Sequence, residues 1–195
     1  MTRAPTIGFR RLVDDDLPLL HRWLNEPGVV TWWEGDDVSF DAVVRDYGAG
    51  SPDPVEHWII VVDGRDRGWI QCYAAADFAE ADETGGWWEL GVPRTAAGVD
   101  YLLGEPADRG RGLGSALLRA FTDDVVFGAH PSWTHVCASP LVSNAASWRA
   151  LANAGFIGVG DFPTEHGPAR LMVRPRDPTA WPRYAETGPS SPRRA

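Results

Sequence analysis

The apolar and polar positions of the first fifty residues follow two different periods. Residues 6–12 alternate well enough between apolar and polar side chains to predict a strand. After the acidic run 14–16, which supplies helix-start chemistry, the apolar residues of 17–24 recur at helical spacing. This spacing predicts a helix that is stopped by Pro27-Gly28, followed by a second short helix over 40–47.

The middle of the chain predicts four strands that follow one another as a meander. Residues 57–62 and 68–74 are rich in apolar and aromatic side chains, and the turn pair Asp63-Gly64 separates them as in a hairpin. Further strands are expected at 87–91 and at 98–103. Because sequential strands with short connections tend to pair, we expect this part of the sheet to be antiparallel.

Helices and strands alternate in the remainder of the chain. A glycine-rich turn leads into a predicted helix over 113–127, and 135–138 reads as a short strand. A helix over 144–154 is ended by Gly155, and a final strand is expected at 169–173. The resulting order, βα(α)ββββαβαβ, indicates an α+β or α/β fold with a mixed sheet.

The length of 195 residues suits one domain with a tail, which we place at 1–176 and 177–195. The tail is rich in Pro and small polar residues, so we expect it to be mobile. No leader-like segment or apolar run of membrane-spanning length is present, and we expect a cytoplasmic protein. Cys72 and Cys137 form no CxxC and the five histidines form no metal motif, so we predict neither a disulfide framework nor a metal site.

The net charge of the chain is −9, and the distribution of acids and bases along the sequence is more informative than this total. Residues 31–108 hold 17 acids and 4 Arg, whereas the remainder holds 10 acids and 14 Arg. This balance argues against a nucleic-acid partner and is compatible with a cationic ligand beside a separate anionic one. Equally, the acids could serve only solubility. The chain has no Lys, which excludes a lysine Schiff base and a Walker A nucleotide site.

The turn Arg109-Gly-Arg-Gly-Leu-Gly114 carries the clearest chemistry. It fits the pattern Arg/Gln-x-x-Gly-x-Gly/Ala and lies between a predicted strand and a predicted helix. Glycines let the backbone approach a ligand closely, and free N–H groups at a helix start form an anion site suited to a pyrophosphate. A Rossmann site is disfavoured because the turn follows a meander and not the first strand of a parallel βαβ unit.

This turn resembles the pyrophosphate loop of the GNAT superfamily of N-acetyltransferases, which bind acetyl-coenzyme A. Ser143-Asn144 followed by 154–156 resembles the next helix of that family, and the element order matches over residues 9–176. The resemblance implies a GNAT-type mixed, mostly antiparallel sheet flanked by helices, with acetyl-CoA as co-substrate. The residues that it assigns to the coenzyme are Leu102, Leu103, Arg109, Gly110, Arg111, Gly112, Leu113, Gly114, Ser115 and Asn144.

A closer resemblance is to the aminoglycoside 6′-N-acetyltransferases. It rests on 23–25, 32–35, 86–89 and 98–103 together with the glycine turn, and on the spacing between them. It implies an antibiotic-resistance enzyme that acetylates the 6′-amine of an aminoglycoside, by direct attack in a ternary complex. A related branch that acetylates a siderophore precursor shares some of these motifs. Another amine, such as a protein N-terminus, and a non-catalytic antibiotic-binding module stay open as alternatives. The oligomeric state, monomer or homodimer, is not predicted.

The resemblance places the proposed general base at Asp100, near the end of the fourth predicted strand. A carboxylate there can attract a cationic amine and accept its proton. Aromatic rings suit the apolar faces of amino sugars and carboxylates suit their ammonium groups. The residues expected around the acceptor are Trp33, Gln71, Tyr73, Trp88, Glu89, Asp100 and His166.

The ten tryptophans are expected to divide between core and cleft. We predict that Trp23, Trp58 and Trp69 fill the core. In each of the pairs Trp32-Trp33 and Trp87-Trp88, one ring should pack inside and the other should face the cleft.

Four positions depart from the family pattern. Leu151 stands where many GNAT enzymes carry a Tyr that can protonate the leaving thiolate. Gly85, Ala138 and His166 stand where relatives carry acids, so the predicted acceptor pocket is less acidic at three points.

Overall fold

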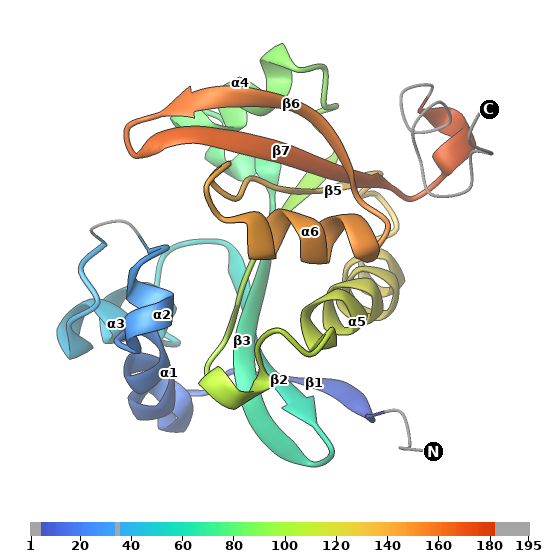
Figure 1. Ribbon diagram of the computed structural model, residues 1–195. Coiled ribbons are helices and arrows are strands. Elements are labelled where there is room, and N and C mark those ends of the chain that lie inside the picture. The colour runs from blue at the N-terminus through green and yellow to red at the C-terminus, as the bar shows by residue number, and fades with distance from the viewer. Residues whose placement is uncertain (1–4, 34–35, 182–195) are drawn as a thin grey trace. The chain divides into compact units, whose positions relative to one another are not determined.

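The computed structural model describes residues 5–33 and 36–181 (Figure 1). The chain divides into two compact units. The first unit comprises Met1–Cys72 and Asp100–Leu113, and the second comprises Tyr73–Val99 and Gly114–Ala195. Of the predicted tail, residues 177–181 are described and the rest lie outside the described residues. Within the described part, no helix combines the length and the apolar character that crossing a membrane requires.

The strands form a seven-stranded sheet in the order β1-β2-β3-β4-β5-β7-β6, and β3 and β4 each contribute to both units. The β4–β5 pair is parallel, whereas β1–β2, β5–β7 and β6–β7 are antiparallel. The predicted mixed, mostly antiparallel sheet is therefore confirmed. The strands are β1 (Ile7–Arg11), β2 (Val55–Val62), β3 (Arg65–Ala74), β4 (Ala96–Leu103), β5 (His135–Ala138), β6 (Ile157–Thr164) and β7 (Gly167–Pro175).

The predicted hairpin between β2 and β3 is confirmed, and its turn explains its register. Asp63 and Gly64 both have positive φ, at 50° and 73°. Two central residues with positive φ make the type I′ turn, whose twist matches that of the flanking strands. Asp63 Oδ1 also accepts a hydrogen bond from the backbone N–H of Thr6 at 2.9 Å, next to the start of β1.

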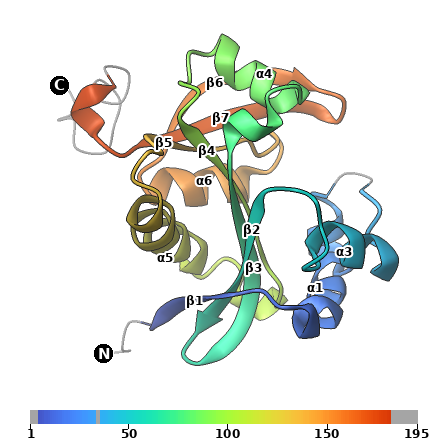
Figure 2. The ribbon, with the colours of Figure 1, turned by 180° about the vertical axis from the view of Figure 1, so that it is seen from behind.

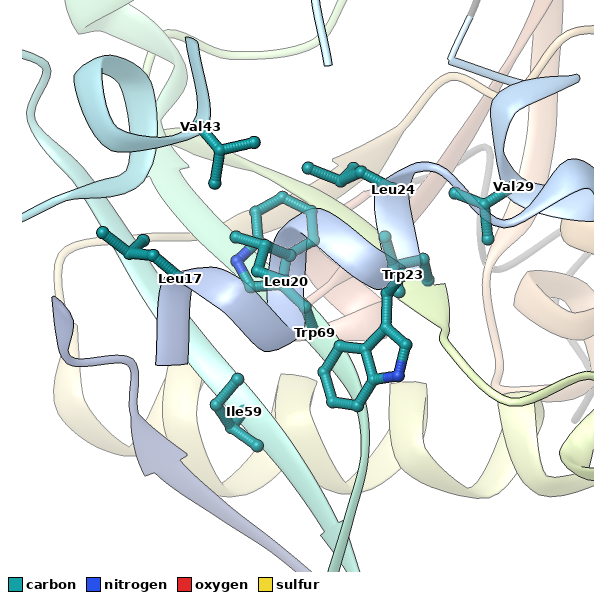
Figure 3. Close-up of a cluster of buried hydrophobic side chains, with 9 residues drawn as sticks. Leu17, Leu20, Trp23, Leu24, Val29, Val43, Ile59 and Trp69 are labelled. Carbon is teal, nitrogen blue, oxygen red and sulfur yellow. The ribbon is translucent and has the colours of Figure 1, made fainter. Parts of the chain in front are cut away.

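The first unit carries the helices α1 (Leu17–Leu24), α2 (Pro27–Val30) and α3 (Phe40–Tyr47). The apolar face of α1 packs onto Ile59 and Trp69 of β2 and β3, and Val43 of α3 joins this cluster (Figure 3). Leu20, Leu24, Ile59 and Trp69 are fully buried, so this cluster is the core of the unit. Pro27 begins α2 as its first residue, so the prediction that Pro27-Gly28 only stops a helix was incomplete.

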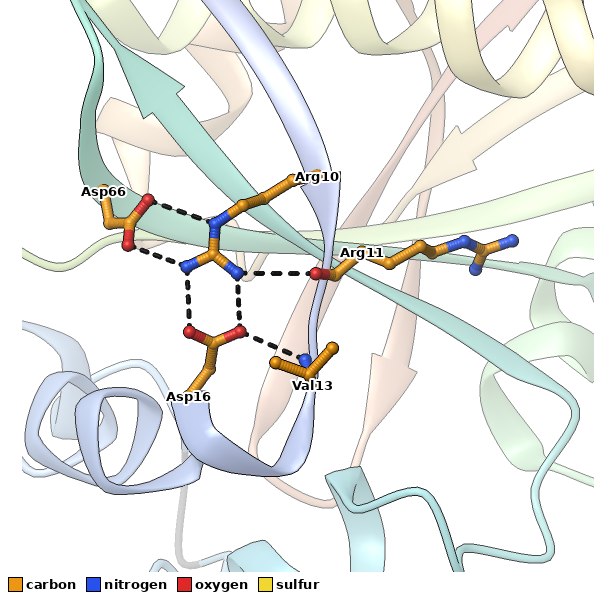
Figure 4. Close-up of polar contacts among 5 residues, drawn as sticks. All are labelled: Arg10, Arg11, Val13, Asp16 and Asp66. Atoms are coloured by element: carbon orange, nitrogen blue, oxygen red, sulfur yellow. Dashed lines mark hydrogen bonds and ion pairs between the residues drawn. The ribbon is translucent and has the colours of Figure 1, made fainter.

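An ion-pair network fixes the start of the first unit (Figure 4). The guanidinium of Arg10 on β1 donates to Asp16 at 2.6 and 2.8 Å and to Asp66 on β3 at 2.7 and 3.3 Å. Asp16 Oδ2 also accepts from the backbone N–H of Val13, and Arg10 holds the pKa of Asp16 below its usual value. The network ties the entry of α1 to the β2–β3 hairpin.

The second unit carries three helices beside β5, β6 and β7. These are α4 (Asp82–Glu89), α5 (Leu113–Ala120, continued by a π-helical stretch over Phe121–Phe127) and α6 (Ala145–Asn153). The α6 helix packs on β6 and β7, and α4 packs on β6 (Figures 1 and 2). Asn144 caps α6 by accepting from the backbone N–H of Ser147, and Gly155 follows the helix with φ 100°.

The predicted strand over 87–91 was wrong, because 82–89 form the helix α4. Thr84 helps to start it by donating its hydroxyl to the carbonyls of Phe78 and Ala81. Gly86 lies so close to Phe162 that a Cβ would stand 2.5 Å from the ring. Trp87 is fully buried, and its indole N–H donates to Ser139 Oγ at 2.5 Å. These long-range contacts override the strand preference of the aromatic pair.

The strand β6 was not predicted. Two glycines and a proline dilute its apolar pattern, and its pairing with β7 shifts register between Gly158 and Gly160. A Cβ at Gly160 would lie 2.8 Å from the side chain of Leu90, so the glycine is needed for close packing with the end of α4.

Candidate functional site

A carboxylate–amide pair lies on the central strands within the first unit. Asp100 lies on β4, and Gln71 on the neighbouring β3 donates its side-chain N–H to Asp100 Oδ2 at 2.7 Å. Both residues were predicted for the site from the sequence. An amide N–H on one carboxylate oxygen orients the carboxyl group and leaves the other oxygen for a further partner.

The surroundings of Asp100 weaken its acidity. Burial raises the pKa of Asp100 because the charged form loses hydration, and the negative charge of Asp36 raises it further. The hydrogen bond from Gln71 acts in the opposite direction and does not outweigh burial. The net effect is a carboxylate that binds a proton more readily than an exposed Asp, which suits a general base.

A hollow of about 260 Å³ lies within the first unit, between the end of α1, Trp33, residues 36–38 and α3. Asp36 and Tyr47 line it. The charge of Asp36 raises the pKa of Asp100, and the charge of Asp100 in turn raises the pKa of Tyr47. The hollow and the Asp100–Gln71 pair are therefore parts of one neighbourhood. Its lining is formed by Leu24, Trp33, Asp36, Asp37, Val38, Arg45, Asp46 and Tyr47.

Aromatic rings form the apolar part of this neighbourhood. Trp33 and Tyr47 both meet the buried Trp69 edge-on, with ring centroids 6.0 and 5.3 Å apart. His57 lies between Tyr47 and Trp69, at 5.2 and 5.8 Å. Burial raises the pKa of Tyr47 to about 12, against a hydrogen bond from Trp33, so this phenol stays neutral. Burial lowers the pKa of His57 to about 4, so the imidazole is neutral as well.

The formal charges that line the hollow favour a cation. Arg45 is the lone base of the lining, and it binds the adjacent Asp46 with two hydrogen bonds of 2.8 Å. The lining thus carries the carboxylates of Asp36, Asp37 and Asp46 beside one guanidinium, and Asp37 accepts from the backbone N–H of Ser39. Carboxylates beside aromatic faces attract ammonium groups on an apolar framework.

The glycine turn is built on left-handed backbone, as its composition predicted. Gly110 and Gly112 have φ of 71° and 80°, and no atom lies within 4 Å of where their Cβ atoms would stand. The turn is therefore open above both glycines, and α5 begins immediately after it at Leu113. The side chain of Arg109, however, donates to Glu26 and to the backbone carbonyl of Leu103, whereas Arg111 is exposed.

The remaining predicted site residues belong to the second unit. Tyr73 is buried, with its ring against Gly98 and 4.9 Å from Phe78. Trp88 lies on α4 beneath the guanidinium of Arg94, at 4.3 Å, and the adjacent Glu89 is exposed. Four further predicted residues take these places: Gly114 and Ser115 in the first turn of α5, Asn144 at the cap of α6, and His166 in the exposed β6–β7 turn beside Glu165.

Burial agrees with two of the three positions predicted for the core and with one inward ring in the pair Trp87-Trp88, whereas neither ring of the pair Trp32-Trp33 is buried. Trp23, Trp69 and Trp87 are buried, Trp33 and Trp88 are half-buried, and Trp32 is 39% exposed. Trp58 is the exception among the predicted core positions, because it is half-buried under the guanidinium of Arg11 at 4.2 Å. Glu34 and Gly35, which follow the first Trp-Trp pair, lie outside the described residues.

Sequence reasoning missed Asp36 and Tyr47 as members of the site. The acidic pair that follows the first Trp-Trp pair was a usable signal for Asp36. Tyr47 carried no signal, because it closes a predicted helix and only the packing of α3 brings its ring to Trp69 and its hydroxyl near Asp100.

Comparison with known proteins gives a consistent result. The model of the family described as the acetyltransferase (GNAT) domain matches residues 13–164. The aminoglycoside N(6′)-acetyltransferase type 1 of Klebsiella pneumoniae is 30% identical over 175 residues, covering 88% of this chain and 84% of that protein. A kanamycin resistance protein of Rhizobium radiobacter is 35% identical over 94 residues, covering 48% of this chain and 85% of that protein.

Solved structures show the same likeness. AAC(6′)-Ib in complex with paromomycin and acetyl-CoA is 31% identical with a TM-score of 0.77, covering 88% of this chain and 94% of that chain. The complex of the same enzyme with coenzyme A and kanamycin is 30% identical with a TM-score of 0.75, covering 88% of this chain and 95% of that chain. The match of the family model, over residues 13–164, includes the residues that line the hollow, Asp100 and the glycine turn.

Proposed function

Because this chain belongs to the GNAT family of acetyltransferases, we propose that it transfers the acetyl group of acetyl-CoA to the 6′-amine of an aminoglycoside. One observation carries the proposal: a half-buried carboxylate of raised pKa, held by an amide, adjoins a hollow lined by acids and aromatic rings. The relative from Klebsiella pneumoniae is named for this activity, and the AAC(6′)-Ib complexes hold aminoglycosides with the coenzyme. We further propose that the reaction takes place in the cytoplasm, where acetyl-CoA is available.

The proposed reaction is a direct attack in a ternary complex. The amine enters as an ammonium, attracted by Asp36 and Asp37, and transfers a proton to Asp100. Its nitrogen then bonds to the thioester carbonyl carbon, and the carbon–sulfur bond breaks with the electron pair on sulfur. No acyl-enzyme is involved: burial raises the pKa of both Cys72 and Cys137, so neither is an activated thiolate.

In this proposal the attacking nitrogen loses its second proton as the amide forms, and water passes that proton to the leaving thiolate, giving the thiol of CoA. Leu151 occupies the position where a tyrosine would be expected, and it is fully buried in α6. A leucine has no proton to give. Because a thiolate is a stable leaving group near neutral pH, the reaction proceeds without a dedicated acid.

The coenzyme is assigned to the turn 109–114 and the end of β4. Gly110 and Gly112 leave the backbone open for a pyrophosphate, and Arg111 adds an exposed positive charge. Backbone N–H groups at Leu102 and Leu103 would polarise the thioester carbonyl as an oxyanion site does.

A matched set of acceptors tests the proposal through release of free CoA. We expect turnover with an aminoglycoside that carries a 6′-amine and none with the same aminoglycoside carrying a 6′-hydroxyl. A hydroxylated diamine of the siderophore-precursor type and a peptide with a free N-terminus complete the panel. Turnover confined to either of these would contradict the proposed substrate. Calorimetric binding of aminoglycosides without CoA release from any amine would contradict the proposed reaction.

A further inference from the structure

The guanidinium of Arg109 donates its hydrogen bonds to groups within the first unit. Its Nε and Nη2 atoms donate to the backbone carbonyl of Leu103 at 3.2 and 3.0 Å. Nη2 also donates to Glu26 Oε2 in an ion pair. Glu26 Oε2 in turn accepts from the backbone N–H of Gly28 at 3.0 Å and so caps the start of α2. The arginine therefore joins the corner between α1 and α2 to the last residue of β4.

The corner is shaped to receive this side chain. A Cβ at Gly28 would lie 2.3 Å from Nη1 and 3.5 Å from Cζ of Arg109, so only glycine allows the guanidinium to lie over the backbone there. The side chains of Arg109 and Glu26 are 31% and 22% exposed, so the pair is partly desolvated. A fork of donors shared between a carboxylate and a carbonyl is a geometry that lysine cannot reproduce.

Arg111 differs from Arg109 in every one of these respects. It lies two residues further along the turn, between Gly110 and Gly112, and is exposed. Within the part of the chain that the structure describes, no hydrogen bond or ion pair is recorded for it. Among the residues that the structure describes, no carboxylate pairs with Arg111, whereas Glu26 pairs with Arg109.

We infer that Arg109 is a positioning residue, and that the contacts of the turn with the pyrophosphate of the coenzyme come from its backbone and from Arg111, without the side chain of Arg109. The Glu26–Arg109 pair fixes the corner from which the chain enters the segment of Trp33 and Asp36, and it fixes that corner to β4, which carries Asp100. This inference rests on the proposed function, because it gives the acceptor segment a defined place relative to the general base. It assigns the first arginine of the turn to acceptor geometry and not to the pyrophosphate.

The test compares Arg109→Met with its matched control Arg111→Met, both in the full chain. Calorimetry with CoA should give a Kd within about twofold of the parent for Arg109→Met and about tenfold weaker for Arg111→Met. Steady-state kinetics should show a KM for the aminoglycoside raised about tenfold by Arg109→Met with the KM for acetyl-CoA unchanged. Equal weakening of CoA binding by the two substitutions would overturn the inference.

Two more variants separate positioning from simple folding. Arg109→Met should lower Tm, because it breaks the ion pair with Glu26, and Glu26→Gln should lower Tm and raise the acceptor KM by similar amounts. The double variant should show no larger change in Tm or in acceptor KM than either single variant. Arg109→Lys retains the charge but not the fork, so it should behave as Arg109→Met. Additive effects, or recovery of the parent's acceptor KM in Arg109→Lys, would contradict the pair as the acting unit.

The CoA affinities and the coupling of Tm are independent of the acceptor. If no aminoglycoside were acetylated, the proposed function would fail while these two measurements still decided the role of Arg109. If Arg109→Met proved too unstable to purify, Glu26→Gln and Arg109→Lys would still give CoA affinities. A CoA Kd weakened tenfold by Arg109→Lys but not by Glu26→Gln would then overturn the inference.

Discussion

Replacing Asp100 by asparagine should impair catalysis while stabilising the fold. Asn retains the size of the side chain and an oxygen that can accept from Gln71, but it cannot accept a proton from the substrate. A positioned general base contributes about 10²–10⁴-fold to a rate. We therefore expect the kcat of Asp100→Asn to fall by about two to four orders of magnitude, with the Kd for CoA unchanged.

The stability effect follows from the raised pKa of Asp100. Burial and the charge of Asp36 raise the folded-state pKa above that of the unfolded chain, so the ionised carboxylate lowers the free energy of unfolding. Each tenfold loss of acidity corresponds to about 1.4 kcal/mol. In a chain of this size 1 kcal/mol shifts Tm by about 2–4 °C. The uncharged asparagine removes that penalty, so Asp100→Asn should melt above the parent near neutral pH.

The effect of Asp100→Asn on Tm should depend on pH. The stabilising effect of a carboxyl group with raised pKa is present below its unfolded pKa of about 3.9 and is lost as pH rises through the folded pKa. The Tm difference between Asp100→Asn and the parent should accordingly vanish in acid and grow toward neutral pH. Glu80→Gln, which removes an exposed carboxylate, is the control and should show neither change.

Thermal melts across pH, together with CoA-release kinetics, measure both effects on one preparation. Full kcat in Asp100→Asn would refute its role as the base. A lowered Tm near neutral pH would refute the argument that the half-buried charge destabilises the fold, even if the activity were lost as expected.

Three further substitutions test other parts of the structure. Asp36→Asn should lower the pKa of Asp100 and so move the acidic limb of the kcat/KM profile to lower pH; an unmoved limb would show that the two carboxylates do not interact. Gly98→Ala should cost about 1–3 kcal/mol in urea unfolding, because the new Cβ would stand 2.2 Å from the buried ring of Tyr73. Gly50→Ala, which points into open space, is its control, and equal midpoints for the two would contradict the packing. His57→Phe should flatten the loss of stability between about pH 6.5 and pH 4, since burial lowers the pKa of His57 to about 4 and the neutral imidazole is lost as pH falls through that range. A profile as steep as the parent's would exclude His57 as the titrating group.

Local chemistry in the sequence determined much of the first unit and the turn. Asp16 accepts from the backbone N–H of Val13, and Ser39 accepts from that of Ala42 at the start of α3. The Asp63-Gly64 pair supplies the two positive φ angles of its own turn. Gly110 and Gly112 likewise adopt left-handed backbone, which glycine permits because it has no side chain. Such features act over short stretches of chain, so the sequence shows them directly.

Long-range contacts decided the rest. The pair Trp87-Trp88 lies in a helix because Trp87 and Gly86 meet side chains from Ser139 and Phe162, more than fifty residues away. Tyr47 joins the site only through its packing on Trp69, and Arg109 turns inward because Glu26 lies within its reach. The sequence by itself determined the turns and most of the strands, with 87–91 and β6 as the exceptions, and it placed a carboxylate at Asp100 near the end of a strand. Tertiary structure alone decided its neighbours, since burial and the charges around a carboxylate arise from groups distant along the chain, and these set its pKa.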